Sequence, residues 1–256
     1  MWHARCGMLG LWMALAVTAG HAVELAYEPV ALGWTTDEVE RATAGTYTSI
    51  TQRAAAAQQL GCLHHCERLQ RIFARLVTVA RGQTKRSQNL PWSLTVVRLP
   101  DVDALALPGG QVIVSEAFID RHALDDDALA FVLAHEIAHC ILEHERQVLT
   151  FARMLLPRDV PRSVRDMYTE MDFNFGLLMA MEPVMHQGEF EADELGLLLA
   201  SVAGFAPRRQ LAFIEGEVAA AGRRPLLSTH PTPQARLDRL RAALPLAERL
   251  LNVAGP

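Results

Sequence analysis

The segment from Phe131 to Glu145, FVLAHEIAHCILEHE, places three histidines and three glutamates in an otherwise apolar run. Within it, His135-Glu-Ile-Ala-His139 matches the pattern H-E-x-x-H. On a helix, residues i and i+4 lie about 40° apart, so both imidazoles point to one side and can share a metal ion. Glu136 projects from the edge of that face, where a carboxylate can take a proton from metal-bound water. The motif therefore predicts one zinc ion (Zn²⁺) per chain, with His135 and His139 as ligands and Glu136 as the catalytic base.

The remaining polar residues of this segment are expected to lie away from the metal. If the helix runs from about 126 to 149, His144 lies about 140° around it from His139 and cannot face the same ion. Leu142 and Glu145 stand where metzincins carry a glycine and a third histidine, which argues against that class. The third ligand must come from another part of the chain.

An acidic stretch at residues 187–196, QGEFEADELG, can supply that ligand. Glu189 and Asp193 share one helical face, whereas Glu191 is about 200° from Glu189 and points away, so Glu191→Ala is expected to be nearly neutral. One acid would complete the metal set and leave a position open for water, while the other could hydrogen-bond a ligand imidazole. The spacing does not choose between Glu189 and Asp193 as the ligand, and a solvated acidic face is the alternative reading.

The patterns around these motifs indicate an α+β fold that is mostly helical, with a small sheet before the HEIAH helix. Short β-branched runs predict strands at 93–99 and 111–115. Helical patterns are separated at Pro183 and at other proline or glycine stops. They are expected at about 36–61, 63–81, 126–149, 162–182, 184–203, 207–221 and 232–251.

A glycine turn precedes the second strand, and this strand is expected to form the sheet edge beside the HEIAH helix. An extended peptide can add to such an edge through main-chain hydrogen bonds. A plain turn without a substrate role is the alternative. The candidate substrate-binding residues are Pro108, Gly109, Gly110, Gln111, Val112 and Ile113.

A late Ser-Thr-His-Pro segment offers another catalytic candidate. Pro231 restricts His230 to an extended backbone, which places the imidazole on a loop. We expect His230 beside the metal, donating a hydrogen bond to the oxyanion of the tetrahedral intermediate. It could instead occupy the fourth metal position and inhibit the enzyme, or belong to a surface turn alone. Arg236, on the following helix, can pair with Asp193 or Glu189.

The N-terminus carries an apolar run of about 13 residues, too short to span a membrane, followed by Gly20-His21-Ala22. This pattern predicts a secretory signal peptide at residues 1–22 and one metallopeptidase domain at 23–256. Export places the protein in the periplasm, and an uncleaved N-terminal membrane anchor is the alternative. In that oxidising compartment Cys62 and Cys66 could form a disulfide, while free thiols or a metal knuckle remain open.

Four segments in order resemble peptidase family M48, the gluzincin zinc metallopeptidases that include HtpX and the CAAX prenyl protease. They are VDALALPGGQVIVSEAFI, DDDALAFVLAHEIAHCILEH, EFEADELGLLLASVAGFAP and STHPTPQARLDRL. The resemblance spans roughly residues 40–245 and implies a zincin-like fold. It also implies that Glu189 is the zinc ligand and that Asp193 supports the site. Asp103 replaces the asparagine usual before the Pro-Gly-Gly segment, and the transmembrane segments of the membrane relatives are missing, so an exported member without them is expected.

Together these features favour a zinc-dependent metalloendopeptidase that hydrolyses exported or envelope proteins. Its expected partners are polypeptide substrates and a membrane surface or envelope complex; the net charge of -5 argues against nucleic acid. A latent, chaperone-like zinc protein that does not hydrolyse its clients is the alternative, and a zinc hydrolase of non-peptide amides is another. Glu136 favours hydrolysis, because a purely structural zinc site needs no general base.

Overall fold

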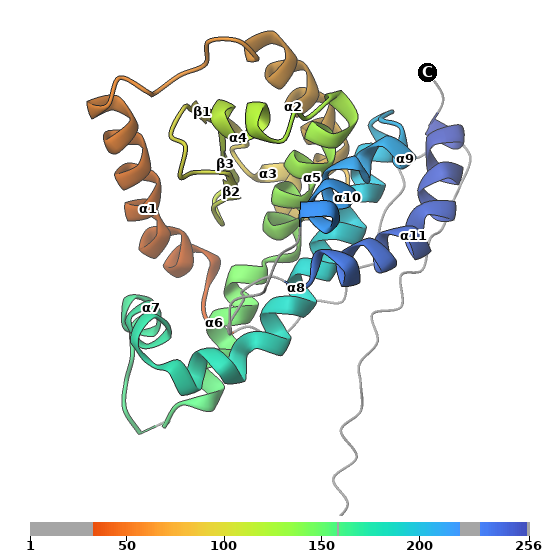
Figure 1. Cartoon of the computed structure of the whole chain (residues 1–256). Helices are drawn as coiled ribbons and strands as arrows, with labels where there is room; N and C mark the ends of the chain where they lie inside the picture. The colour runs from red at the N-terminus through yellow and green to blue at the C-terminus, as the bar shows by residue number, and fades with distance from the viewer. Residues whose placement is uncertain (1–32, 158, 221–230, 255–256) are drawn as a thin grey trace, which may run out of the picture.

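The computed structural model describes residues 33–157, 159–220 and 231–254. Helices surround one small three-stranded sheet, which confirms the predicted α+β class (Figure 1). The predicted signal peptide at residues 1–22 and the catalytic candidate His230 lie outside the described residues.

The first half of the chain builds the sheet and the helices around it. A capping box between Thr35 and Glu38 starts the first helix, as the acidic first turn of the sequence suggests. The elements in order are α1 (Thr36–Ala56), α2 (Cys66–Arg81), α3 (Lys85–Asn89), β1 (Ser93–Val97), β2 (Ala104–Ala106), β3 (Gln111–Ser115) and α4 (Glu116–Arg121).

The strand order corrects the prediction about the sheet edge. β3 lies in the centre, parallel to β1 and antiparallel to β2, with Leu105 opposite Ile113. The edge strands are therefore β1 and β2, and β2, not residues 111–115, is the edge beside the HEIAH helix. β2 is only Ala-Leu-Ala, so its sequence has neither the length nor the β-branched residues by which a strand is recognised.

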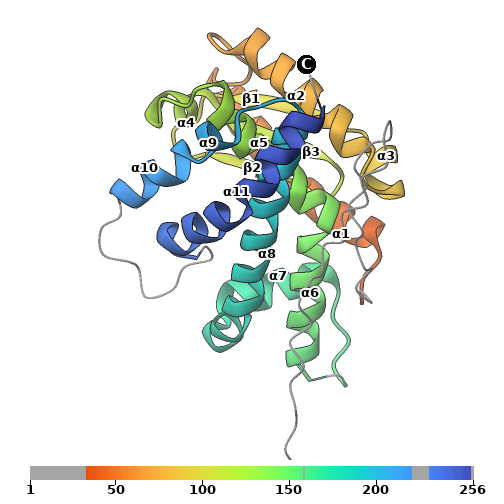
Figure 2. The ribbon, with the colours of Figure 1, turned by 90° about the vertical axis from the view of Figure 1, so that its right-hand side faces the viewer.

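The second half of the chain forms the helical body. Its elements are α5 (Asp126–Leu142), α6 (His144–Leu155), α7 (Val164–Phe173), α8 (Phe175–Val202), α9 (Pro207–Gln210), α10 (Ala212–Ala220) and α11 (Pro233–Ala254). In Figures 1 and 2, α8 runs diagonally past α5, and α11 lies along the outer side of α8.

Several predicted helix boundaries were wrong, and two of them bear on the site. The helix expected to reach residue 149 ends at Leu142, and Glu143 has left-handed backbone angles before α6 begins. The break expected at Pro183 lies instead at Asn174, so the helix expected at 162–182 is divided between α7 and α8, and α8 runs on through the proline. α8 starts where the Asn174 Oδ1 accepts the Leu177 N–H at 3.0 Å. It then continues through the proline, whose cost in hydrogen bonding is offset by packing, since Met181 is fully buried.

The core is centred on α5, where Leu129, Leu133 and Ile137 have no exposed surface. α8 crosses α5 at very close range: a Cβ added to Gly196 would lie 2.8 Å from the backbone nitrogen of His135. The glycine is therefore required at this point by the approach of two backbones, and it brings the acidic segment of α8 against the HEIAH helix.

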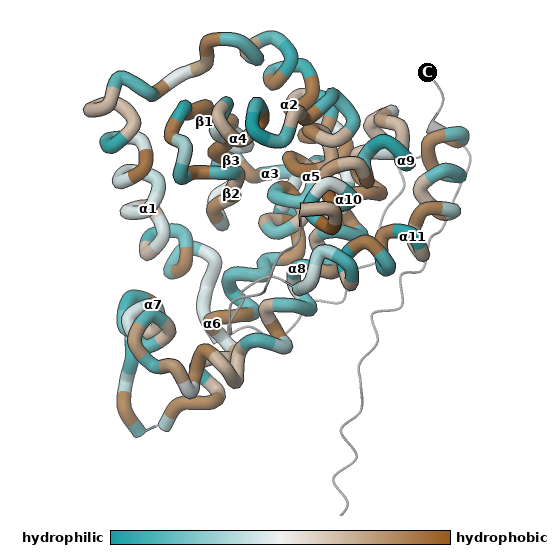
Figure 3. The backbone as a smooth tube through the Cα atoms, viewed as in Figure 1, coloured by the Kyte–Doolittle hydropathy of each residue, from teal (hydrophilic) through white to brown (hydrophobic). Residues whose placement is uncertain are grey.

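A second feature is the end of the molecule formed by α6, α7 and the start of α8, where the tube of Figure 3 carries many hydrophobic residues. The large apolar side chains exposed there are Met154, Leu155, Val160, Phe173, Phe175 and Met179. We call this set the apolar end. None of the helices in the described parts of the chain is both long and apolar enough to span a bilayer.

The sulfurs of Cys62 and Cys66 are joined in a disulfide, which decides among the three alternatives for this pair. The loop before α2 is not helical, so the Cα atoms can approach to 5.5 Å. The Glu116 carboxylate, almost fully buried, accepts the backbone N–H groups of residues 63–65 at 2.8–2.9 Å. Burial would raise the pKa of Glu116, but these hydrogen bonds outweigh it and lower the pKa.

Candidate active site

Three donor side chains from two helices converge at the centre of the molecule. The Nε2 atoms of His135 and His139, both on α5, are 3.0 Å apart. The carboxylate of Glu189, on α8, lies 3.7 Å from the first and 3.4 Å from the second of these nitrogens. Ligand atoms around a tetrahedral zinc ion at roughly 2.1 Å are about 3.4 Å apart. The residues therefore fit a zinc ion in both donor type and spacing.

The far nitrogen of His135 is held by a buried ion pair. Its Nδ1 lies 2.9 Å from Asp193 Oδ1, and Asp193 has no exposed surface. Arg236 of α11 donates to both oxygens of that carboxylate, at 2.7 and 2.6 Å, so it pairs with Asp193 rather than with Glu189. Burial alone would raise the pKa of Asp193, but the hydrogen bonds from Arg236 and His135 hold it below its usual value.

The far nitrogen of His139 has a different partner, which the sequence did not predict. His139 Nδ1 lies 2.9 Å from Nδ1 of His144, and the other nitrogen of His144 lies 3.2 Å from a carboxylate oxygen of Glu191. The expectation that Glu191 points away from the site, with a neutral alanine variant, is therefore not supported by its position. The expectation that His144 does not share the metal agrees with the geometry, although His144 does contact a ligand.

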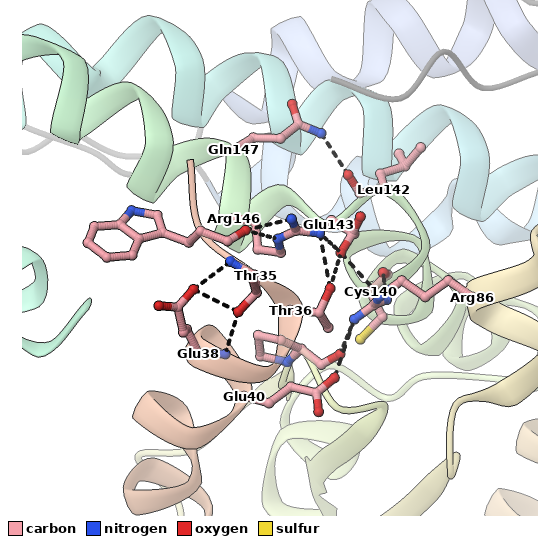
Figure 4. A network of polar contacts seen from close by, with 12 residues as sticks. Thr35, Thr36, Glu38, Glu40, Arg86, Cys140, Leu142, Glu143, Arg146 and Gln147 are labelled. Carbon is pink, nitrogen blue, oxygen red and sulfur yellow. Dashed lines mark hydrogen bonds and ion pairs between the residues drawn. The ribbon is translucent and has the colours of Figure 1, made fainter. Parts of the chain in front are cut away.

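The break after α5 brings His144 to that place. A non-glycine residue in the left-handed region is strained by about 1 kcal/mol, so Glu143 must be held there by its surroundings. One of its carboxylate oxygens accepts Thr36 Oγ1 at 3.0 Å and Arg146 Nη1 at 2.5 Å, and lies 3.1 Å from Arg86 Nε (Figure 4). Gln147 donates to the Leu142 carbonyl at 2.6 Å.

Arg86 also connects the catalytic helix to the sheet. Its guanidinium donates to the carbonyl of Cys140 at 2.6 Å and to that of Pro108 at 2.5 Å. The Cys140 carbonyl lies in the last turn of α5, and Pro108 follows β2. This partly buried cation thus links the histidine helix to the edge strand, a role that nothing in the local sequence of residues 82–91 indicates.

A cavity of about 390 Å³ opens over the donor residues. Glu136 is partly exposed and lines it together with His135 and His139, so the three motif residues face one space. The opposite walls come from β2 and the segment after it, residues 104–108, and from apolar residues of α6, α7 and α8, namely Val148, Met171 and Met185.

The candidate substrate-binding residues are only partly in that cavity. Pro108 lines it, whereas Gln111, Val112 and Ile113 belong to the central strand, and Val112 and Ile113 are fully buried. Gly109 and Gly110 form the turn, with a positive φ of 83° at Gly110. The assignment of residues 111–113 to an open edge is thus corrected, because both edges of β3 are already paired.

Main-chain groups of β2 provide the open edge instead. Leu107 N–H donates to Gln111 O at 2.8 Å, and Ser115 N–H donates to Asp103 O at 2.9 Å. Residues 103, 105 and 107 therefore direct their N–H and C=O groups toward β3. By alternation, Ala104 and Ala106 direct theirs away from β3, on the side that lines the cavity.

Comparison with known proteins agrees with this arrangement. The sequence model of Peptidase family M48 matches residues 64–244, which include the donor residues and most of the walls. The chain belongs to peptidase family M48.

Individual relatives of this M48 chain are named as metalloendopeptidases or as a protease. Mitochondrial metalloendopeptidase OMA1 of Schizosaccharomyces pombe is 32% identical over 70% of this chain and 52% of its own length. The human mitochondrial metalloendopeptidase OMA1 is 29% identical over 62% of this chain and 33% of its own. The Beta-barrel assembly-enhancing protease of Escherichia coli is 27% identical over 59% of this chain and 34% of its own length. The chain thus spans about half or less of the length of these relatives.

Proposed function

We propose that the protein is a zinc metalloendopeptidase. The observation that carries this proposal is the convergence of His135, His139 and Glu189 in one cavity with Glu136. A structural metal site has four protein ligands and no neighbouring base, whereas three ligands with a carboxylate beside them are typical of hydrolytic sites. The metalloendopeptidase names of the OMA1 relatives support the same function.

In this site a zinc ion would lower the pKa of water and polarise the scissile carbonyl. Glu136 takes the proton from the attacking water and delivers it to the departing amine. Asp193, clamped by Arg236, keeps the proton of His135 on Nδ1, so that Nε2 of this residue stays available as a metal ligand.

A peptide substrate would lie in an extended conformation along β2. The main-chain groups of Ala104 and Ala106 would pair with the substrate backbone, which gives affinity without a strong side-chain preference. The small alanine side chains leave room beside the strand, and the apolar wall of Met171 and Met185 favours apolar substrate side chains.

The substrates are exported or envelope proteins of the periplasm. The disulfide between Cys62 and Cys66 supports an oxidising compartment. The apolar end supports association with a membrane surface or an envelope complex, since several large apolar side chains are exposed at one end of the molecule. N-terminal sequencing of the exported protein would distinguish cleavage after residue 22 from retention of an anchor, and sedimentation with lipid vesicles would test the apolar end.

His230 is proposed to donate to the oxyanion, on the sequence argument given above. The described chain supports this proposal, because Pro231 is buried and Arg236, a few residues later, reaches Asp193. His230→Ala is expected to keep zinc and to lose about 100-fold in kcat. A gain of activity would identify an inhibitory ligand instead, and an unchanged rate would assign His230 to the turn.

The decisive experiment compares wild type with Glu136→Gln on an unfolded polypeptide such as reduced casein. Wild type is expected to cleave it with about one zinc bound per chain, whereas Glu136→Gln should retain the zinc and lose cleavage. Equal cleavage by both proteins would disprove the mechanism. Zinc binding and polypeptide binding without cleavage by wild type would favour the chaperone-like alternative.

A further inference from the structure

His144 is a buried imidazole, 5% exposed, that is not a metal donor and yet lies against one. Its Nδ1 is 2.9 Å from Nδ1 of His139, and its Nε2 is 3.2 Å from Oε2 of Glu191. Gln187 Nε2 donates to the other oxygen of that carboxylate at 2.8 Å. A continuous row of polar groups therefore runs from α8 through α6 to the histidine helix.

The donors and acceptors in this row fit together in only one sense. When Nε2 of His139 binds a metal ion together with His135 and Glu189, the proton of His139 is on Nδ1. That N–H donates to Nδ1 of His144, which must then carry its own proton on Nε2 and donate it to Glu191. In this arrangement every hydrogen bond of the row has one donor and one acceptor.

The packing of His144 is specific. A Cβ placed on Gly188 would lie 3.4 Å from Cγ of His144, so the imidazole rests against the backbone of α8. The left-handed residue Glu143 sets the direction of α6 that brings the ring there. A straight continuation of α5 would turn residue 144 away from His139.

We propose that His144 and Glu191 are positioning residues that fix the proton and the ring orientation of His139 and thereby strengthen zinc binding. This inference rests on the proposed function, since it requires zinc at the His135, His139 and Glu189 site. Its physical basis is that a metal-bound imidazole binds more tightly when an acceptor holds its other N–H.

The first test uses two side chains of similar size at position 144. In His144→Asn the amide oxygen can take the place of Nδ1 and accept the His139 N–H, whereas in His144→Leu no acceptor remains. We expect His144→Leu to bind zinc roughly 10- to 100-fold more weakly than wild type, and His144→Asn to stay within about threefold. The dissociation constant is measured by competition with a chromophoric chelator.

The second test addresses the carboxylate. Glu191→Leu should weaken zinc binding about tenfold, and Glu191→Gln, which keeps an acceptor, should have a smaller effect. Glu194→Gln is the matched control, because Glu194 lies on the same helix and pairs with Arg239 at 3.5 Å, away from the histidines. Thermal unfolding of the zinc-free proteins separates lost folding from lost affinity.

The outcomes distinguish the two levels of the argument. If wild type binds no zinc, the proposed function fails. If wild type binds one zinc and both leucine variants bind it equally well, only the positioning role is overturned. If His144→Leu binds as tightly as wild type while His144→Asn binds weakly, position 144 contributes packing alone, which also overturns the inference.

Discussion

The two histidines of one motif are supported in different ways. His135 contacts the ionised carboxylate of Asp193, which is fully buried and clamped by Arg236 of α11. His139 contacts a neutral imidazole, whose carboxylate partner Glu191 is farther from the metal donors and partly exposed. The first support uses charge and a third helix, whereas the second uses only the neighbouring turn and α8.

This difference indicates which side of the site depends on the whole fold. Removal of one partner from a buried ion pair leaves the other charge uncompensated, so the His135 side should be coupled strongly to stability. The His139 side consists mainly of neutral groups, so its loss should reduce metal affinity more than stability.

The largest effect should come from removing a donor that both sides share. Glu189→Ala leaves two nitrogen donors and should abolish stoichiometric zinc binding, as should His135→Ala. Elemental analysis after dialysis measures this. Retention of one zinc per chain in either variant would refute the donor set. It would also remove the basis for comparing the supports of His135 and His139.

The next effect concerns the charged support. Asp193→Ala leaves Arg236 without its partner in a largely buried position and should destabilise the protein by about 3–5 kcal/mol in chemical unfolding. The double variant Asp193→Ala with Arg236→Met should recover part of that loss, because the isolated charge is gone. If the single variant is as stable as wild type, the ionic support is not what distinguishes the two sides.

Two glycines of α8 form a matched pair, one on each side. Gly196→Ala would place a Cβ 2.8 Å from backbone of His135 and should cost about 1–3 kcal/mol. Gly188→Ala would place one 3.4 Å from the His144 ring, an ordinary contact, and should be neutral or slightly stabilising because alanine favours helix. Thermal melts of both variants would sharpen the comparison, and equal losses would contradict it.

The smallest effect serves as a reference, since it concerns a buried carboxylate outside the metal site. Because the pKa of Glu116 is lowered from 4.5 by folding, its stabilising contribution is complete above that value and disappears as pH falls through the lowered pKa. Glu116→Gln should therefore be less stable than wild type at pH 7, and the difference should shrink below about pH 4. A difference independent of pH would assign the effect to lost packing.

The motif residues were predictable because they depend on local spacing. The i, i+4 relation brings His135 beside His139 on any regular helix, and the same relation brings Glu189 into line with Asp193. The mostly helical fold with a small sheet before the motif was also predictable, from the periodicity of the apolar residues. Whether Arg236 pairs with Asp193 or with Glu189 was left open, because the pairing depends on how α11 lies against α8.

The errors share a physical cause. Pro183 was expected to end a helix, yet the packing of α8 outweighs the loss of one hydrogen bond. Residues 111–115 were expected at the sheet edge, because the three residues of β2 gave no strand signal and sheet order is a long-range property. Glu191 was expected to point away from Glu189 because of its helical angle, and its contact with His144 could not be foreseen, since that contact depends on where α6 lies.

The sequence by itself determined the candidate chemistry of this protein: which side chains can bind a metal, which carboxylate can act as a base, and that two helices present them. Only the tertiary structure decided where the motif helix stops. Residue Glu143 has no local preference for a left-handed conformation, and it adopts one because Thr36, Arg86 and Arg146, distant in the chain or on the next helix, converge on its carboxylate. That break places His144 against His139. Tertiary contacts offset the strain at Glu143, and a local sequence pattern does not contain those contacts.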